Sequence, residues 1–369
     1  MTTEIILNIS GLTKQFGSVV AVSSVSVGVA RGKTGVLLGP SGCGKTTILR
    51  CTAGLERTTD GTISIDSKLV SSRDVHVSPD RRNIGMVFQS YALWPKMSVA
   101  DNVEFPLRQI KKMTRTDSKQ RARDLLAQVG MAGMEERLPG QLSGGQQQRV
   151  AVARALAGDP ALLLMDEPLS ALDPLLRDQV RQELKSIITN SGIACLYVTH
   201  DQREALAMAD SMVIMRGGKI LEMGAPMDIY PHPSSSFGAH FLGARNEIHG
   251  TVVGVGEGGF CKARVSGGTV ILFTPGKSWI PCLDEGVALL WRPSSMKVLD
   301  GQEDGAANIW PCRVEKALYL GEEWEVELGL FEEEKAVGQS LRPVAPGQPC
   351  FAHVDPASVF GFHSLSKQD

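Results

Sequence analysis

A glycine-rich segment that ends in lysine and threonine carries the strongest chemical signal in the sequence. Residues 39–46 read Gly-Pro-Ser-Gly-Cys-Gly-Lys-Thr, which fits the phosphate-binding pattern G-x-x-x-x-G-K-[ST]. Glycine lets backbone N–H groups turn toward phosphate oxygens, and the start of the following helix attracts negative charge. Lys45 can reach the β- and γ-phosphates of a nucleotide, while the Thr46 hydroxyl can ligate Mg²⁺. The predicted nucleotide contacts are Gly39, Pro40, Ser41, Gly42, Cys43, Gly44, Lys45, Thr46 and Thr47.

Two adjacent carboxylates follow a strongly apolar run. Residues 161–168 read Ala-Leu-Leu-Leu-Met-Asp-Glu-Pro. Carboxylates at the end of a buried strand are costly unless a metal ion or hydrogen bonds satisfy them. Asp166 fits a role in holding Mg²⁺, and Glu167 can act as the general base that polarises an attacking water. Taken alone, the pair is equally consistent with this role and with two ordinary acids at a strand end that face solvent. Beside a phosphate-binding loop, the hydrolytic interpretation is favoured.

A second serine- and glycine-rich loop precedes a helical pattern. Residues 142–146 read Leu-Ser-Gly-Gly-Gln, and Ser143 stands where a helix would begin. A helix start of this kind attracts an anion, although this loop lacks a phosphate-binding lysine. The plain alternative is an ordinary N-cap. Two such loops in one chain indicate a nucleotide that is held from two sides, with Ser143, Gly144, Gly145 and Gln146 as its further contacts.

Four apolar runs position these groups, at residues 35–38, 84–88, 161–165 and 194–198. Continuous apolar strands suit a sheet that is covered on both faces, so an α/β architecture is predicted. Each run ends at a glycine or a polar residue, and ligands bind at the carboxyl ends of such strands. We therefore expect the four ends to converge on one site.

The rest of the chain divides into a helical insertion and a β-rich part. Residues 118–129 have helical periodicity within an insertion of about residues 90–145. From about residue 246, β-branched runs alternate with turns, which predicts an all-β domain of small barrels over 246–369. The predicted domain boundary follows residue 243.

Composition narrows the function classes. The chain has 369 residues and a net charge of -2. This balance does not indicate a basic surface that would bind nucleic acid or an anionic membrane. The acidic stretch 322–334 lacks the basic and stacking pattern of an oligonucleotide-binding barrel. Seven cysteines without metal-ligand spacing indicate reduced thiols, and Cys43 is interpreted as a small loop residue rather than a redox group. The longest weakly polar stretch, 19–30, is too short to span a bilayer.

With these segments in place, the sequence resembles the ABC ATPase family over residues 4 to about 243. Residues 142–146 look like the signature motif of that family. By this resemblance, Phe16 stacks on adenine, with a buried core phenylalanine as the alternative. Gln89 touches Mg²⁺ and the lytic water, Asp173 belongs to the D-loop, and His200 contacts the γ-phosphate. The resemblance thus implies Glu167, His200 and Gln89 as catalytic residues, and Thr46, Gln89 and Asp166 around Mg²⁺.

The resemblance is most specific to importer subunits of the maltose, polyamine and iron(III) type. Residues 91–95, 199–202 and 224–230 read like that branch, and residues 246–369 look like its C-terminal TOBE region of OB-like barrels, with 290–293 and 320–321 as landmarks. The implied fold is an α/β P-loop ABC ATPase domain with a helical subdomain, followed by an all-β regulatory domain.

The resemblance also implies partners and a place in the cell. Two copies would pack head to tail with two ATP molecules between them, on transmembrane permease subunits at the cytoplasmic face of the membrane. A periplasmic or extracellular solute-binding protein would act indirectly, and the solute stays open. A soluble ABC ATPase of DNA repair or translation, or an exporter subunit, is the alternative. A soluble ATPase of DNA repair would need a coiled-coil or zinc insertion. A translation factor would need two ATPase cassettes on one chain. The β-rich C-terminal domain argues for import rather than export.

Overall fold

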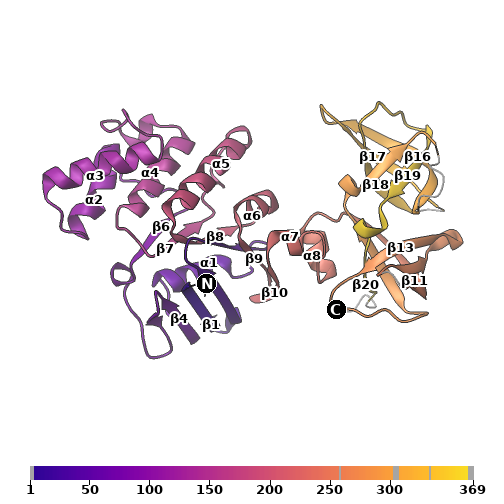
Figure 1. Ribbon diagram of the computed structural model, residues 1–369, viewed down its shortest axis with the longest axis horizontal. Helices are drawn as coiled ribbons and strands as arrows, with labels where there is room; N and C mark the ends of the chain where they lie inside the picture. The colour runs from indigo at the N-terminus through magenta and orange to yellow at the C-terminus, as the bar shows by residue number, and fades with distance from the viewer. Residues whose placement is uncertain (1–3, 257–258, 302–306, 332–333, 365–369) are drawn as a thin grey trace. The chain divides into compact units, whose positions relative to one another are not determined.

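The computed structural model describes residues 4–256, 259–301, 307–331 and 334–364, and its chain forms two compact units that divide between Pro226 and Met227 (Figure 1). This division precedes the boundary predicted after residue 243. The physical reason is a buried arginine of the second unit. Arg292 donates hydrogen bonds to the carbonyls of Leu242 and Tyr230, at 2.9 and 2.6 Å, and its guanidinium lies 3.7 Å from the Tyr230 ring centroid. Two residues of the acidic stretch, 332 and 333, lie outside the described residues.

The first unit is built on a six-stranded sheet. Its strand order is β10 (Lys219–Gly224), β9 (Ser211–Arg216), β3 (Thr34–Leu38), β8 (Ala194–Thr199), β7 (Leu162–Asp166) and β6 (Ile84–Val87). All neighbours are parallel except β9 and β10. Every residue of β3, β7 and β8 is buried, as continuous apolar runs require in a sheet covered on both faces. The predicted α/β sheet is confirmed.

A second, antiparallel sheet of this unit has the order β2 (Val19–Ala30), β1 (Ile5–Phe16), β4 (Asp60–Ile65) and β5 (Lys68–Ser71). Its apolar side chains share one core with α1 (Lys45–Ala53) and the six-stranded sheet. The weakly polar stretch 19–30 is strand β2. Among the residues that the structure describes, no helix has both the length and the apolar character needed to cross a membrane.

Helices α2 (Val99–Gln109), α3 (Arg115–Gln128) and α4 (Gly144–Leu156) pack together as the helical part (Figure 1). Ser98 caps α2 and Thr114 caps α3 by accepting hydrogen bonds from backbone N–H groups. The remaining helices of this unit are α5 (Pro174–Ser191) and α6 (Gln202–Met208), with short 3₁₀ turns at Pro79–Arg81 and Pro139–Gln141. The helix predicted over 118–129 is confirmed as α3.

The second unit contains two closed β-barrels, preceded by α7 (Pro226–Ile229), whose first residue lies at the division, and α8 (Ser236–Phe241). The first barrel has the order β11 (Asn246–Val255), β12 (Cys261–Arg264), β13 (Val270–Pro275), β20 (Phe360–His363) and β14 (Gly286–Trp291). The second has the order β15 (Met296–Leu299), β18 (Lys335–Ser340), β17 (Trp324–Gly329), β16 (Ile309–Tyr319) and β19 (Pro349–Val354). Short 3₁₀ turns lie at Ser266–Gly268, Pro293–Ser295 and Pro356–Ser358. The predicted all-β region is confirmed.

The C-terminal strand β20 closes the first barrel by fitting between β13 and β14, and Gly361 makes that fit. A Cβ atom at Gly361 would lie 2.2 Å from ring atoms of Phe273, which is fully buried. We expect Gly361→Ala to lower the free energy of unfolding of the second unit by about 1–3 kcal/mol, because an overpacked core must shift. Thermal unfolding by circular dichroism measures the loss. Gly301→Ala is the control, since no atom of the described residues lies within 4 Å of the place that its Cβ atom would take. Equal stability of the two variants would contradict this account.

Candidate functional site

The parallel register of the main sheet brings the predicted catalytic groups to one edge. Leu38 of β3 pairs with Thr199 of β8, and Val198 of β8 pairs with Asp166 of β7. The phosphate-binding loop, Glu167 and His200 therefore begin side by side at the carboxyl ends of these strands. Strand β6 ends at the same edge, because its Val87 pairs with Met165 of β7. Gln89 lies just after the end of β6. The expected convergence of the four strand ends is confirmed.

Steric limits at two glycines shape the phosphate-binding loop. A Cβ atom at Gly39 would lie 2.5 Å from the Met215 carbonyl oxygen, and one at Gly44 would lie 2.6 Å from the Ala21 carbonyl oxygen. Gly44 also has φ +105°, a conformation that side chains rarely adopt. The loop is thus a tight backbone cradle that opens α1, which is the geometry that binds phosphate at a helix N-terminus.

The lysine of this loop is buried within it. The Lys45 ammonium donates hydrogen bonds to the carbonyl oxygens of Gly39 and Pro40, at 2.7 and 3.0 Å. Cys43 is also buried, 3% exposed, which agrees with a small packing residue. A compact ammonium inside a glycine cradle is a donor set that fits the oxygens of a nucleotide triphosphate.

Asp166 and Thr46 form the next part of the site. The Thr46 hydroxyl donates a hydrogen bond of 3.1 Å to Asp166 Oδ1, which joins the start of α1 to the end of β7. Burial raises the pKa of the Asp166 carboxyl, and the hydrogen bond from Thr46 opposes that rise. A hydroxyl and a buried carboxylate side by side are oxygen ligands of the kind that Mg²⁺ prefers.

Glu167 stands in a strained backbone position and contacts His200. Its φ is +45°, although it is not a glycine, and its backbone N–H donates to the carbonyl of Val198 at 3.0 Å. Ser170 Oγ donates to the Glu167 carbonyl at 2.8 Å and so holds the turn. Nδ1 of His200 lies 3.1 Å from Oε2 of Glu167. Strain of this kind concentrates at functional sites, where it aims a side chain.

The second glycine-rich loop lies in the helical part, at the start of α4. It does not directly follow β3, β7 or β8. Ser143 caps the helix reciprocally with Gln146. The Gln146 N–H donates to Ser143 Oγ at 3.4 Å, and the Ser143 N–H donates to Gln146 Oε1 at 3.0 Å. A Cβ atom at Gly144 would lie 2.9 Å from a methyl group of Leu172, and one at Gly145 equally close to Val180. This loop therefore presents a close-packed helix start.

The remaining predicted residues are exposed. Phe16 ends β1 and is 45% exposed, so it is not a core residue, and Lys14 Nζ lies 4.4 Å from its ring centroid. Gln89 and His200 are exposed at the sheet edge, and Asp173 is exposed immediately before α5. Side chains at these exposed places can be reached by a ligand.

Sequence reasoning missed a buried carboxyl behind His200. Glu204 Oε2 accepts hydrogen bonds from Thr199 Oγ1 at 2.7 Å and from the Tyr197 hydroxyl at 3.0 Å. Asp201 caps α6 by accepting from the N–H groups of Arg203 and Glu204. These contacts fix the junction of β8 and α6, which carries His200. The acid pair Asp201 and Glu204 around a helix start was a readable capping signal, but its partners on β8 were not.

Comparison with known proteins identifies this arrangement. A model described as ABC transporter matches residues 22–170. The Fe(3+) ions import ATP-binding protein FbpC of Rhizobium etli is 44% identical over 89% of this chain and 91% of the relative. The chain belongs to the ABC transporter family. FbpC of Escherichia coli is 36% identical over 98% of each chain, and the spermidine/putrescine import protein PotA of Rubrobacter xylanophilus is 39% identical over 85% and 81%.

Solved ABC cassettes share the fold of the first unit. The dimeric, post-hydrolysis cassette MJ0796 bound to ADP and Pi has TM-score 0.52 at 29% identity, over 60% of this chain and 99% of that one. CbiO1 of Clostridium perfringens, part of the complex cbiONQ, has TM-score 0.56 at 26% identity, over 62% and 91%. The chain is the ATP-binding and ATP-hydrolysing subunit of an ABC transporter of the importer type, as predicted.

The buried carboxyl Glu204 of this ABC ATPase gives a prediction of pH-dependent stability. Burial raises the pKa of Glu204. Between the ordinary and the raised pKa the native state binds more protons than the unfolded state, so this group lowers stability as pH rises. Glu204→Gln keeps an oxygen acceptor for both hydroxyls without the charge. We expect its unfolding temperature at pH 8 to exceed that of the natural protein by about 2–4 °C, the shift that ~1 kcal/mol produces in a domain of this size.

The difference should shrink as the pH is lowered from 8 to 5, because Glu204 of the natural protein gains its proton as the pH falls through its raised pKa. Calorimetry across this pH range measures it. Glu136→Gln, at an exposed position, is the matched control and should leave the profile unchanged. A lower unfolding temperature of Glu204→Gln at pH 8 would show that the charged form stabilises the fold.

Proposed function

We propose that this ABC ATPase subunit hydrolyses ATP through Glu167 as general base, in a site that a second copy of the chain completes. The contact between Glu167 and His200 at the sheet edge carries the proposal, because it aims the carboxylate beside the phosphate-binding loop. A general base must lie within hydrogen-bond reach of the proton that it accepts, and this edge offers the place.

Each group at the edge has one task in this proposal. Lys45 and the backbone of residues 39–47 bind the phosphates, and Phe16 stacks on adenine. Thr46, Asp166 and Gln89 hold Mg²⁺, which when bound offsets the charge that develops on the phosphate oxygens. Glu167 accepts a proton from the attacking water, and His200 orients Glu167 and contacts the γ-phosphate. The raised pKa of Asp166 fits a carboxyl that is buried to receive a cation.

A second copy supplies the opposite wall of the site. Residues 143–146 begin α4 in the helical part, whereas residues 39–47 lie at the edge of the main sheet. One chain thus carries two phosphate-facing surfaces on different elements. Two copies packed head to tail place each ATP between the phosphate-binding loop of one and Ser143 of the other, near Asp173. The dimeric solved cassette with ADP and Pi supports this arrangement.

An apolar groove in the helical part is the docking place for a permease. A cavity of about 460 Å³ is lined by Phe88, Trp94, Phe105, Ile110 and Arg154, among others. Ile110 is 62% exposed, and the Trp94 and Phe105 rings lie 4.7 Å apart. A groove of this kind accepts the apolar face of a helix. The occupant is a cytoplasmic helix of a transmembrane permease, so the subunit sits on the inner membrane face, and a solute-binding protein acts from outside.

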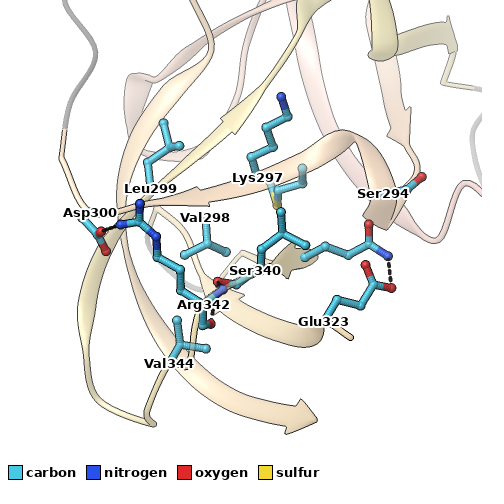
Figure 2. A pocket seen from close by; sticks show the side chains of 12 residues that line it. Ser294, Lys297, Val298, Leu299, Asp300, Glu323, Ser340, Arg342 and Val344 are labelled. Atoms are coloured by element: carbon cyan, nitrogen blue, oxygen red, sulfur yellow. Dashed lines mark hydrogen bonds and ion pairs between the residues drawn. The ribbon is translucent and has the colours of Figure 1, made fainter. Parts of the chain in front are cut away.

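The second unit is regulatory in this proposal. Its second barrel holds a cavity of about 430 Å³ beside β15 and β18 (Figure 2). Met296, Val298 and Val344 give it an apolar lining. Two polar pairs lie at the cavity, Arg342 with Asp300 at 2.7 Å and Gln339 with Glu323 at 2.8 Å. A hollow with few convergent polar groups suits a small ligand. A dimer-stabilising appendage is the competing role.

Solute choice lies outside this subunit. Relatives that match most of the chain at similar identity are named for Fe(3+) and for spermidine/putrescine. Relatives of similar identity to this chain are thus named for cargo as different as a metal ion and a polycation, so the proposal is ATP-driven import with the solute selected by its partners.

Removing the charge of the proposed base tests the hydrolytic role. We expect Glu167→Gln to bind ATP as the natural protein does and to lose turnover by about 10²–10⁴-fold, the usual contribution of a general base. ATP binding is followed with a fluorescent analogue and turnover by phosphate release. Glu56→Gln, at a carboxyl that pairs with Lys14, is the control. Near-normal turnover by Glu167→Gln would remove the assignment.

Mixing two inactive subunits tests the shared site. Lys45→Ala removes the phosphate-binding ammonium, and Ser143→Arg blocks the helix start of α4. We expect each variant alone to be inactive and an equimolar mixture to recover part of the hydrolysis, because a mixed dimer contains one site built from two natural surfaces. Circular dichroism checks that both variants are folded, and light scattering checks that they associate. A mixture that stays inactive while it forms dimers argues against the arrangement across two copies.

A further inference from the structure

A buried arginine of α4 holds the turn that follows Gln89. The Arg154 side chain is 9% exposed, and its Nη1 and Nη2 atoms donate hydrogen bonds to the carbonyl oxygens of Ala92 and Tyr91, at 2.5 and 2.8 Å. Among the described residues, no carboxylate forms an ion pair with Arg154. Burial of a charge is costly unless polar groups satisfy it, so these two carbonyls are the groups that keep Arg154 in place.

The turn that Arg154 holds has a strained backbone. Tyr91 and Ala92 have φ values of +60° and +48°, in the left-handed region that residues with side chains seldom adopt. The left-handed conformation costs a bulky residue such as tyrosine more free energy than it costs asparagine or glycine. Two consecutive residues persist there only where the surroundings fix them, and the planar guanidinium fixes both carbonyls at once.

This turn contacts two functional surfaces. On one side, the Tyr91 ring is buried next to the helix start that bears Ser143. Its hydroxyl oxygen lies 3.7 Å from the place that a Cβ atom would take at Gly144. That hydroxyl has no hydrogen-bond partner within the described parts of the chain. On the other side, the Arg154 guanidinium lies 5.1 Å from the Trp94 ring centroid, and Ala92, Trp94 and Arg154 all line the apolar groove.

We propose that Arg154 is the positioning residue that couples the apolar groove, where the permease docks, to the loop of residues 143–146. A helix seated in the groove moves Trp94, and the guanidinium passes this movement to the turn of Tyr91 and Ala92. The Tyr91 ring then moves the backbone of Gly144, and with it the surface that faces ATP of the second copy. This inference rests on the proposed docking of a permease in the groove and adds the residue that carries the movement.

Arg154→Lys in the assembled transporter tests the inference. Lysine keeps the charge but cannot bridge two carbonyls with one planar group or stack on Trp94. In proteoliposomes with the cognate permease and binding protein, we expect solute uptake per ATP hydrolysed to fall about tenfold, within the range of coupling changes that single residues produce. ATP hydrolysis by the subunit alone and its co-purification with the permease should match those of the natural protein.

Arg149→Lys is the matched control, because Arg149 lies on the same helix but pairs with Glu183 at 2.9 Å. It should leave uptake per ATP unchanged. If Arg154→Lys does not fold, Arg154→Met removes the buried charge together with both hydrogen bonds and carries the same expectation. Measurements on the natural transporter come first, since absence of permease-dependent hydrolysis there would reject the proposed function itself.

Three results would overturn the role of Arg154. Unchanged uptake per ATP in Arg154→Lys excludes coupling through this residue. A proportional loss of hydrolysis by the isolated subunit shows that Arg154 serves the fold or the catalytic site. Loss of co-purification with the permease shows that it shapes the groove for docking only.

Discussion

The parallel hydrogen-bond register of β3, β8 and β7 is the constraint on which the site depends. These strands are buried along their whole length, so their pairing cannot slip without exposing or displacing core side chains. With Leu38 opposite Thr199 and Asp166 opposite Val198, the loops that leave the three strands must start from one line. The glycine cradle, the acid pair and His200 meet because the hydrophobic core fixes where their strands end.

Polar and charged groups buried around this edge turn the register into rigid geometry. Lys45 is held by loop carbonyls, Asp166 by Thr46, and Glu204 by two hydroxyls of β8. Each of these groups would be expensive to bury alone, and each ties two elements together through the bond that satisfies it. The functional groups that meet solvent, such as His200, are thus carried by a scaffold with little freedom. Arg154 acts in the same way on the turn after Gln89, and this common design links the catalytic edge with the helical part.

The second unit is organised differently, because its first barrel does not close from consecutive strands alone. The chain leaves the first barrel after β14, builds β15 to β19, and returns with β20 to fill the place between β13 and β14. One apolar cluster extends through both barrels, from Ile248 to Val359. The two barrels therefore depend on each other for their cores. The cavity beside β15 lies where β15 and β18 share a single paired position, Lys297 with Gln339.

Local patterns in the sequence determined the elements and most of the chemistry. The apolar runs gave β3, β6, β7 and β8, and the glycine spacing gave the phosphate-binding loop, because strands buried on both faces and loops that bind phosphate each restrict residue types at every position. The motif residues Lys45, Asp166 and Glu167 could be singled out for the same reason. Only the tertiary structure decided strand order, the contact of Glu167 with His200, the place of Glu204 behind it and the hold of Arg154 on Tyr91 and Ala92. The contacts of Glu167 and Arg154 join residues far apart in the chain. From the sequence, Arg154 looks like an ordinary charge on an amphipathic helix, because only the fold shows that it is buried. The return of β20 and the earlier division at Pro226 were hidden for the same reason, since both follow from packing between distant segments, on which local residue patterns carry no information.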